Sequence, residues 1–162
     1  MPPGARPGAQ RGLTLIELLV SVAVLAVLAS TAAPFMGDMI ANGRLREGGN
    51  LVLTETLIAQ SEAVKRNGTV RVSLNGSSVQ VIDVTDAAVP VVLRTRTLVQ
   101  TAWAPTVTYD FGPEGRPAPF GTSVSVNLTS TGGSCSSDLR CPGLRVDAGG
   151  AVRLCGNHLE AC

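Results

Sequence analysis

The sequence has few of the residues on which most enzymes depend. Of its 162 residues only one is histidine, aromatic residues make up 3%, and charged residues make up 15%, against about a quarter in an average soluble domain. The formal net charge is +1, so no overall positive field attracts nucleic acid. All four cysteines lie between residues 135 and 162. These shortages argue against a large metalloenzyme or a long disordered polymer, and the clustered cysteines favour an oxidising compartment.

Hydrophobic residues are abundant, at 44%, and one segment holds much of the excess. Residues 13–33 read LTLIELLVSVAVLAVLASTAA and carry a single charge, that of Glu17. A helix of about 20 residues crosses the hydrocarbon core of a bilayer. Residues 1–12 contain two arginines and no acidic residue. This pattern predicts that the N-terminus stays in the cytoplasm while the long C-terminal part is exported.

Three interpretations of the apolar segment compete. A secretory signal peptide fits the basic start and the small residues near Ala32, and it predicts a mature β domain that begins near Pro34. A plain membrane anchor fits the length but leaves Glu17 unexplained, because a carboxylate in hydrocarbon is costly without a partner. The third interpretation starts from the residues around the beginning of the segment, RGLTLIE from Arg11 to Glu17. They resemble the class III signal of type IV pilins and type II secretion pseudopilins, and this interpretation is favoured.

The resemblance implies that a prepilin peptidase cleaves after Gly12 on the cytoplasmic side. Leu13 then becomes the first mature residue and is N-methylated, although the family usually has phenylalanine or methionine there. Glu17 falls at the position of the family's glutamate, and Pro34 falls where pilins commonly carry a proline. In a filament, Glu17 is expected to neutralise the Leu13 amine of a neighbouring subunit. The alternative is that Glu17 pairs with its own amine or with water.

Beyond residue 33 the helix is expected to continue over residues 34–67, with a kink or break at Pro34. The hydrophobic spacing predicts a buried face that carries Leu53, Leu57 and Val64. Polar residues are left mainly for the other faces, namely Glu55, Gln60, Glu62 and Lys65. A basic last turn followed by Asn67-Gly68 predicts the end of the helix.

Residues 68–162 are expected to form an antiparallel β domain, because the hydrophobic period changes to that of strands. The predicted strands are 69–74, 79–84, 91–99, 106–111, 123–129, 144–147 and 151–155. Asn75-Gly76 predicts a hairpin turn. On the third strand, Arg94 and Arg96 are expected on one face and Leu93 on the other. A helix followed by a run of strands predicts an α+β fold.

Three further segments resemble the GspH/FimT subfamily. They are residues 60–70, QSEAVKRNGTV, and the strand blocks at 109–115 and 144–154. The resemblance covers nearly the whole chain from Gly12. It implies a pilin-like fold, in which the second half of a long N-terminal helix packs on an antiparallel sheet. It also implies a minor subunit that acts by assembly, is anchored in the inner membrane by one helix and places its C-terminal domain in the periplasm.

The partners implied are the prepilin peptidase, the other minor subunits and the major subunit, the inner-membrane platform protein and, indirectly, the assembly ATPase. The favoured function is that of a subunit of a type II secretion pseudopilus. The alternative is a type IV pilus minor pilin for pilus initiation, adhesion or DNA uptake. Arg140, Arg145 and Arg153 lie in the terminal region, but residues 38–162 contain 11 basic and 11 acidic residues. Solvated arginines are therefore favoured over a nucleic-acid site.

No enzymatic site, cofactor or metal is expected. His158 stands alone between two cysteines, and no CxxC pair is present. The cysteines are expected to form two structural disulfides. A hairpin around Gly149-Gly150 favours nested pairing, Cys141 with Cys155 and Cys135 with Cys162. The alternative is sequential pairing, Cys135 with Cys141 and Cys155 with Cys162.

Overall fold

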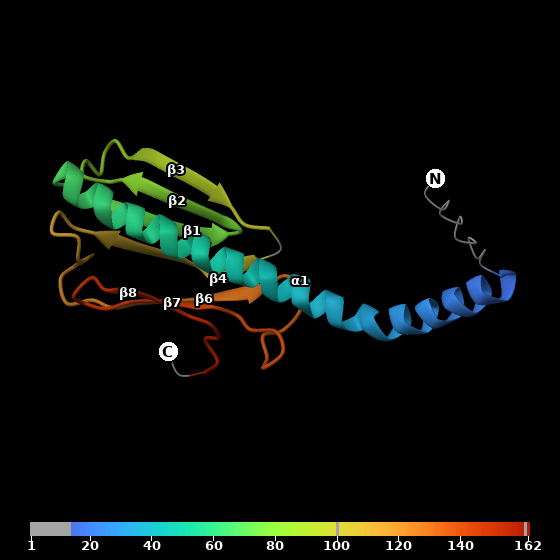
Figure 1. The fold of residues 1–162 in the computed structure, drawn as a ribbon. Coiled ribbons are helices and arrows are strands. Elements are labelled where there is room, and N and C mark those ends of the chain that lie inside the picture. Colours follow the sequence, from blue (N-terminus) through green and yellow to red (C-terminus); the bar gives the residue numbers. More distant parts are fainter. Residues whose placement is uncertain (1–13, 100, 161) are drawn as a thin grey trace, which may run out of the picture. The chain divides into compact units, whose positions relative to one another are not determined.

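A computed structural model describes residues 14–99, 101–160 and 162, and the chain divides into two compact units, Met1–Gly37 and Asp38–Cys162. One helix, α1 (Leu15–Arg66), contributes residues to both units (Figure 1). The helix continues through Pro34, so this proline does not end it, and the boundary between the units follows Gly37. The predicted α+β class is confirmed, because all the strands follow this helix.

The second unit is an antiparallel sheet with the C-terminal part of α1 packed on one face (Figure 1). The strand order is β3-β2-β1-β4-β6-β7-β8, and the short β5 pairs with β4. The strands are β1 (Val70–Gly76), β2 (Ser78–Asp83), β3 (Val91–Thr97), β4 (Thr101–Phe111), β5 (Pro117–Ala118), β6 (Val124–Ser130), β7 (Gly143–Val146) and β8 (Val152–Cys155).

The predicted buried face of the helix is wrong in two of its three residues, and only Leu53 packs, partly buried, against the core. The side chains of Leu57 and Val64 are 46% and 53% exposed. Five of the buried residues of α1 follow one another at intervals of three, four or seven, as one helix face requires, and they are Leu45, Val52, Thr56, Ala59 and Ala63. Three of these five side chains are small, so the helix lies close to the sheet, and Leu51 and Leu53 beside them pack partly buried against the core.

Two glycines of α1 show how close this approach is. A Cβ atom on Gly48 would lie 3.0 Å from Leu128 Cδ2, and one on Gly49 would lie 2.9 Å from Pro142 Cβ. Both positions are buried. A Cβ on Gly43, by contrast, would meet nothing within 4 Å. The glycines at 48 and 49, which weaken the helix taken alone, are therefore where the backbone contacts the sheet.

The C-terminus of α1 ends as predicted, after Arg66. Asn67 adopts a left-handed conformation, with φ of 51°. Its N–H donates to Val64 O at 3.2 Å, and the N–H of Gly68 donates to Ala63 O at 3.1 Å. These two bonds form a Schellman motif, which supplies partners for carbonyl groups that the last turn of a helix leaves free.

Bulges account for two differences from the predicted strands. β4 begins at Thr101, before Pro105 rather than after it. The β1–β4 register shifts beside Asn75, so Pro105 falls in a bulge where its missing N–H costs no ladder bond. In β3 the register shift makes Leu93 an extra residue, and Leu93 packs on the core that Arg94 also faces. The predicted placement of Leu93 on the opposite face is therefore wrong.

The sheet has two parts, and within the described residues only three residue pairs of β4 and β6 join their ladders. Gln60 of α1 connects the same two parts elsewhere. Its Nε2 donates to Gly115 O, in the turn between β4 and β5, at 2.6 Å, and to Gly150 O, in the β7–β8 turn, at 3.0 Å. One side chain of the helix, expected on a free face, therefore contacts both parts of the sheet.

Candidate functional site

The first candidate site is the start of α1. Gly12 and Leu13, the predicted cleavage and methylation residues, lie outside the described residues. Thr14 directly precedes the helix, and its N–H and Oγ1 both donate to Glu17 Oε2, at 3.0 and 2.8 Å. The N–H of Glu17 in turn donates to Thr14 Oγ1 at 3.3 Å. This reciprocal arrangement is a capping box.

The capping box gives Glu17 a local role that the sequence interpretation missed, although Thr-x-x-Glu before an apolar run is its usual signal. A carboxylate in the first turn also lies at the positive end of the helix dipole. Glu17 is exposed in this chain, so the capping bonds leave its second oxygen accessible to another group. Pairing of Glu17 with an amine of a neighbouring subunit stays a prediction.

The apolar side chains that follow Glu17 are uncovered. The large hydrophobic residues between Leu15 and Leu28 are 53% to 82% exposed. Within the described residues, neither segment of α1 taken alone, Leu15–Thr31 or Met36–Arg66, is long and apolar enough to span a membrane, but the two together meet that condition by length and composition.

The disulfides join neighbours in sequence, Cys135 with Cys141 and Cys155 with Cys162. The favoured nested pairing is therefore wrong. The β7–β8 register explains why, because Gly143 and not Cys141 lies opposite Cys155. Cys141 instead lies opposite the segment that follows β8, where the N–H of His158 donates a hydrogen bond to Cys141 O at 2.7 Å.

His158 is tied to this carbonyl by its ring as well, with Nδ1 at 3.0 Å from Cys141 O. Among the residues that the structure describes, no three His, Cys, Asp or Glu side chains gather as metal ligands. The Cys135–Cys141 loop is also attached to α1. Asn42 Nδ2 donates to Asp138 O at 2.7 Å, and Asn42 Oδ1 accepts from the N–H of Arg140 at 2.9 Å.

The second candidate site, which the sequence interpretation missed, is a buried carboxylate between helix and sheet. Glu55 was expected on a free face, yet it is only 3% exposed. Arg94 of β3 donates through Nε to Glu55 Oε2 at 2.8 Å and through Nη2 to Oε1 at 3.0 Å. Arg96 adds a longer contact, Nε to Oε1 at 3.4 Å. These bonds, above all those from Arg94, lower the pKa of Glu55.

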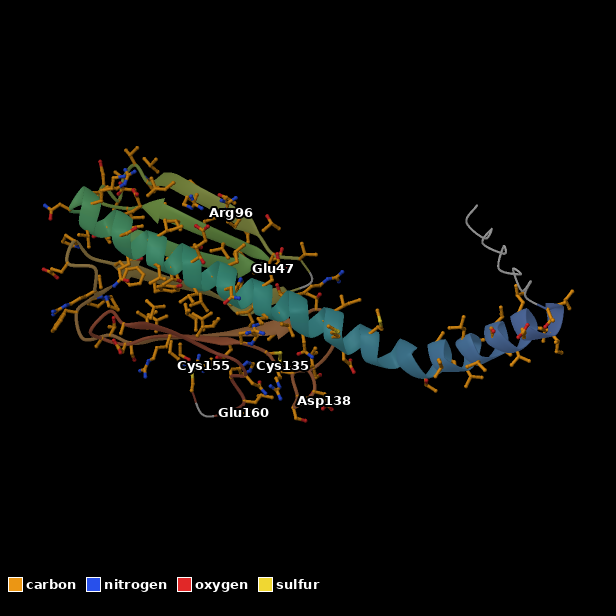
Figure 2. All side chains as sticks on the ribbon, viewed as in Figure 1. Glu47, Arg96, Cys135, Asp138, Cys155 and Glu160 are labelled. Carbon is orange, nitrogen blue, oxygen red and sulfur yellow. A yellow bond between two sulfur atoms is a disulfide. The ribbon has the colours of Figure 1, made fainter. Side chains whose placement is uncertain are left out.

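A groove of about 630 Å³ opens beside this cluster, between α1 and β3. Glu47 of α1 and Arg96 of β3 both line it (Figure 2). In the sequence, the alternation of Arg94 and Arg96 on a strand indicates that both face the same side. The sequence did not show which helix residue would meet them.

The third candidate site is a pair of clefts that share Arg140, Leu154, Cys155 and Gly156. Arg46 of α1 lines the first cleft, of about 570 Å³, and Arg153 lines the second, of about 410 Å³. Arg145, the other predicted arginine, is occupied elsewhere, since its Nη1 donates to Asn127 Oδ1 and two carbonyl groups. Arg140 thus lines one cleft together with Arg46 and the other together with Arg153, and Arg46 is a residue that the sequence interpretation did not include.

The prokaryotic N-terminal methylation motif matches residues 8–33, which span Gly12, Leu13 and Glu17. The chain thus has a prepilin-type N-terminus. No curated protein matches the sequence.

The fold resembles that of a minor pilin. Two crystal forms of the type IV minor pilin FimU from Pseudomonas aeruginosa strain PAO1 match with TM-scores of 0.53 and 0.54. The identities are 17% and 15%, over 67% and 69% of this chain and 90% and 88% of FimU. A long helix followed by an antiparallel sheet is thus a pilin-like fold. Together with the methylation motif, this fold is consistent with the GspH/FimT-like minor pilin that the sequence indicated.

Proposed function

We propose that the chain is a non-catalytic minor subunit of a pilin-type filament. Residues 13–33 hold it in the inner membrane before assembly, and residues 68–162 form a domain on the periplasmic side. The observation that carries this proposal is a capped helix with uncovered large apolar side chains in a chain that has the methylation motif. Such a surface is stable only when lipid or other helices cover it.

The partners follow from the same proposal. A prepilin peptidase removes residues 1–12, the platform protein and the assembly ATPase drive incorporation, and other minor subunits and the major subunit surround the helix. In the filament, Glu17 neutralises the Leu13 amine of a neighbour. A charge pair in a medium of low dielectric sets register as well as attraction.

Two kinds of filament fit this function. The sequence favoured a type II secretion pseudopilus, and the likeness to FimU supports a type IV pilus through the fold. Deleting the gene separates them, because the first predicts loss of protein secretion with pili intact and the second predicts loss of pili with secretion intact.

Processing gives the direct test of the proposal. Intact-mass measurement is made on the chain expressed with and without a prepilin peptidase. Cleavage after Gly12 and one added methyl group are expected, and Gly12→Val is expected to stay uncut. A mature N-terminus near Pro34 would instead identify a signal peptidase product and a released β domain.

A second candidate function, capture of DNA, is favoured by one observation: Arg46 and Arg140 line one cleft, and Arg140 and Arg153 line the adjoining cleft, where Glu160 also lies. Phosphate contacts by such arginines make affinity fall with salt. Binding of a labelled duplex should weaken in Arg140→Gln and stay unchanged in Arg145→Gln, whose side chain already has partners. Equal effects of the two changes would remove this candidate.

A further inference from the structure

β3 is the terminal strand of the sheet, and no described strand pairs with its outer side. The hydrogen bond from Leu98 N–H to Ser77 O, at 2.7 Å, shows which residues of β3 are hydrogen-bonded to β2. Because antiparallel residues alternate in hydrogen bonding, Arg94 and Arg96 bond to β2, and Thr95 and Thr97 present their N–H and C=O groups to the open edge. The exposed side thus offers a template for another strand.

The usual protection of an edge is incomplete here. Charged side chains and β-bulges normally discourage strand addition, and the bulge of β3 at Leu93 leaves residues 94–97 in regular pairing. In β3 the arginines turn toward Glu55 of the helix instead, at 2.8 Å for Arg94 and 3.4 Å for Arg96. Val91 and Val92 on the same strand are 52% and 54% exposed. The edge therefore combines free backbone groups with uncovered apolar side chains.

The charge beside this edge is positive. The groove between α1 and β3 is lined by three arginines and two glutamates, Arg46, Arg94, Arg96, Glu47 and Glu55. Arg94 donates a hydrogen bond to each oxygen of Glu55, and Arg96 adds only its long contact through Nε. Within the described part of the chain, the terminal nitrogens of Arg96 donate no hydrogen bond, and its side chain is 54% exposed. A carboxylate on an added strand would supply the missing partner.

Charge also argues against a second copy of this chain at the edge. Antiparallel pairing of β3 with another β3 about Thr95 would set Arg94 opposite Arg96. The other terminal strand, β8, carries Arg153 and would do the same. Like charges on adjacent strands are destabilising.

From these observations we propose that the β3 edge binds an extended, acidic segment of a different protein by strand addition, with an acidic side chain of that segment on Arg96. Backbone bonds to Thr95 and Thr97 supply affinity, and alternate side chains supply selectivity. One face of the added strand carries acidic residues toward the α1–β3 groove, and the other carries apolar residues beside Val92. The inference does not depend on membership of a pilus or a pseudopilus.

The test uses the full-length chain in detergent and labelled peptides of seven residues, the length of β3. One peptide alternates valine with glutamate, and its counterpart alternates valine with lysine. The glutamate peptide should bind about tenfold more tightly, because it exchanges an unfavourable charge pair with Arg96 for a favourable one. It should also protect the Thr95 and Thr97 amides from hydrogen exchange.

Matched variants locate the site. Arg96→Gln should weaken glutamate-peptide binding about tenfold, while Arg153→Gln on β8 should not. N-methylation of alternate peptide amides should abolish binding without any change to the protein, so a misfolded variant cannot mimic this result. Equal affinity for the two peptides, no binding, or protection confined to β8 would overturn the proposal. Protection of Thr95 and Thr97 by self-association without peptide would assign the edge to a second copy and would also overturn it.

Discussion

Glu55 on α1 and Arg94 on β3 are joined by two parallel hydrogen bonds, at 2.8 and 3.0 Å, across the interface between the helix and the terminal strand. The carboxylate is almost completely buried, while the side chain of Arg94 is 36% exposed. The pair therefore fixes β3 to the helix from the inside, and its loss leaves polar groups without partners.

The first prediction concerns this pair. Glu55→Gln keeps the size of the side chain but removes the charge that both arginines bind. The free energy of unfolding should fall by about 2 kcal/mol, because bonds to a charged, buried group are lost. Urea unfolding measures the change. Glu62→Gln is the control, since Glu62 pairs with Lys65 and Arg66 on an exposed surface and should matter much less.

The second prediction concerns the pH dependence of the same pair. The pKa of Glu55 is lowered in the folded chain, so the folded state binds its proton more weakly than the unfolded state does. Its contribution to stability is present above the ordinary glutamate pKa of 4.5 and is lost as pH falls through the lower folded-state pKa. The stability difference between wild type and Glu55→Gln should therefore shrink on acidification below that value. A difference that stays constant between pH 7 and the acid range would contradict the assignment.

The third prediction uses glycines of one helix. Gly43→Ala should stabilise the chain by about 0.5–1 kcal/mol, because alanine favours the helix and its Cβ meets nothing. Gly49→Ala should destabilise it by about 1–3 kcal/mol, because its Cβ would overlap Pro142. Thermal unfolding of the two variants measures both signs. The same sign in both variants would mean that the helix does not approach the sheet at Gly49.

The fourth prediction concerns disulfide connectivity. Trypsin cuts after Arg140, Arg145 and Arg153, so sequential pairing gives two separate products under non-reducing conditions. One links the peptide containing Cys135 to residues 141–145, and the other is residues 154–162 with an internal bond. Nested pairing would join all three peptides in one product. Mass spectrometry distinguishes the two patterns.

The fifth prediction separates the two roles of Glu17. Glutamine can also close a capping box, so Glu17→Gln should keep the bonds to Thr14 and remove only the charge. If the charge pair with a neighbouring subunit drives assembly, Glu17→Gln and Glu17→Ala should both be cleaved and inserted in the membrane but fail to enter filaments. Glu17→Asp should partly restore entry. The readout is the amount of each variant in sheared filaments relative to its amount in the membrane fraction.

Incorporation of Glu17→Gln at the wild-type level, with failure of Glu17→Ala, would assign the defect to the cap. That result would remove the intermolecular role of Glu17 and leave the methylation motif and the fold as the support for a filament subunit.

The order of helix and strands could be predicted because each depends on local pattern. The end of α1 at Arg66 and the β7–β8 hairpin at Gly149-Gly150 are each set by residues close by in the sequence. The buried helix face could not be predicted in the same way. Leu57 and Val64 are more apolar than Thr56, but Thr56 lies where the helix meets the sheet and its hydroxyl bonds to that of Tyr109 at 2.7 Å.

The candidate sites divide similarly. The N-terminal residues Gly12, Leu13 and Glu17 fall in a contiguous motif, so sequence alone indicates them. The Glu55–Arg94 pair and the convergence of Arg46 with Arg140 join residues far apart in the chain, and only tertiary packing brings them together. The predicted disulfide pairing was wrong for a related reason. The position of the turn fixes which residues lie opposite each other on β7 and β8, and the sequence does not show that position to within one residue.

The two bonds of Gln60 have a mechanical consequence. The two parts of the sheet share three residue pairs at β4 and β6, and Gln60 fastens a turn from each part to the helix. A pull along α1 is thus transmitted to both parts at once, and no single ladder carries the whole load. When force is applied through α1, the domain should therefore resist separation of its strands one at a time.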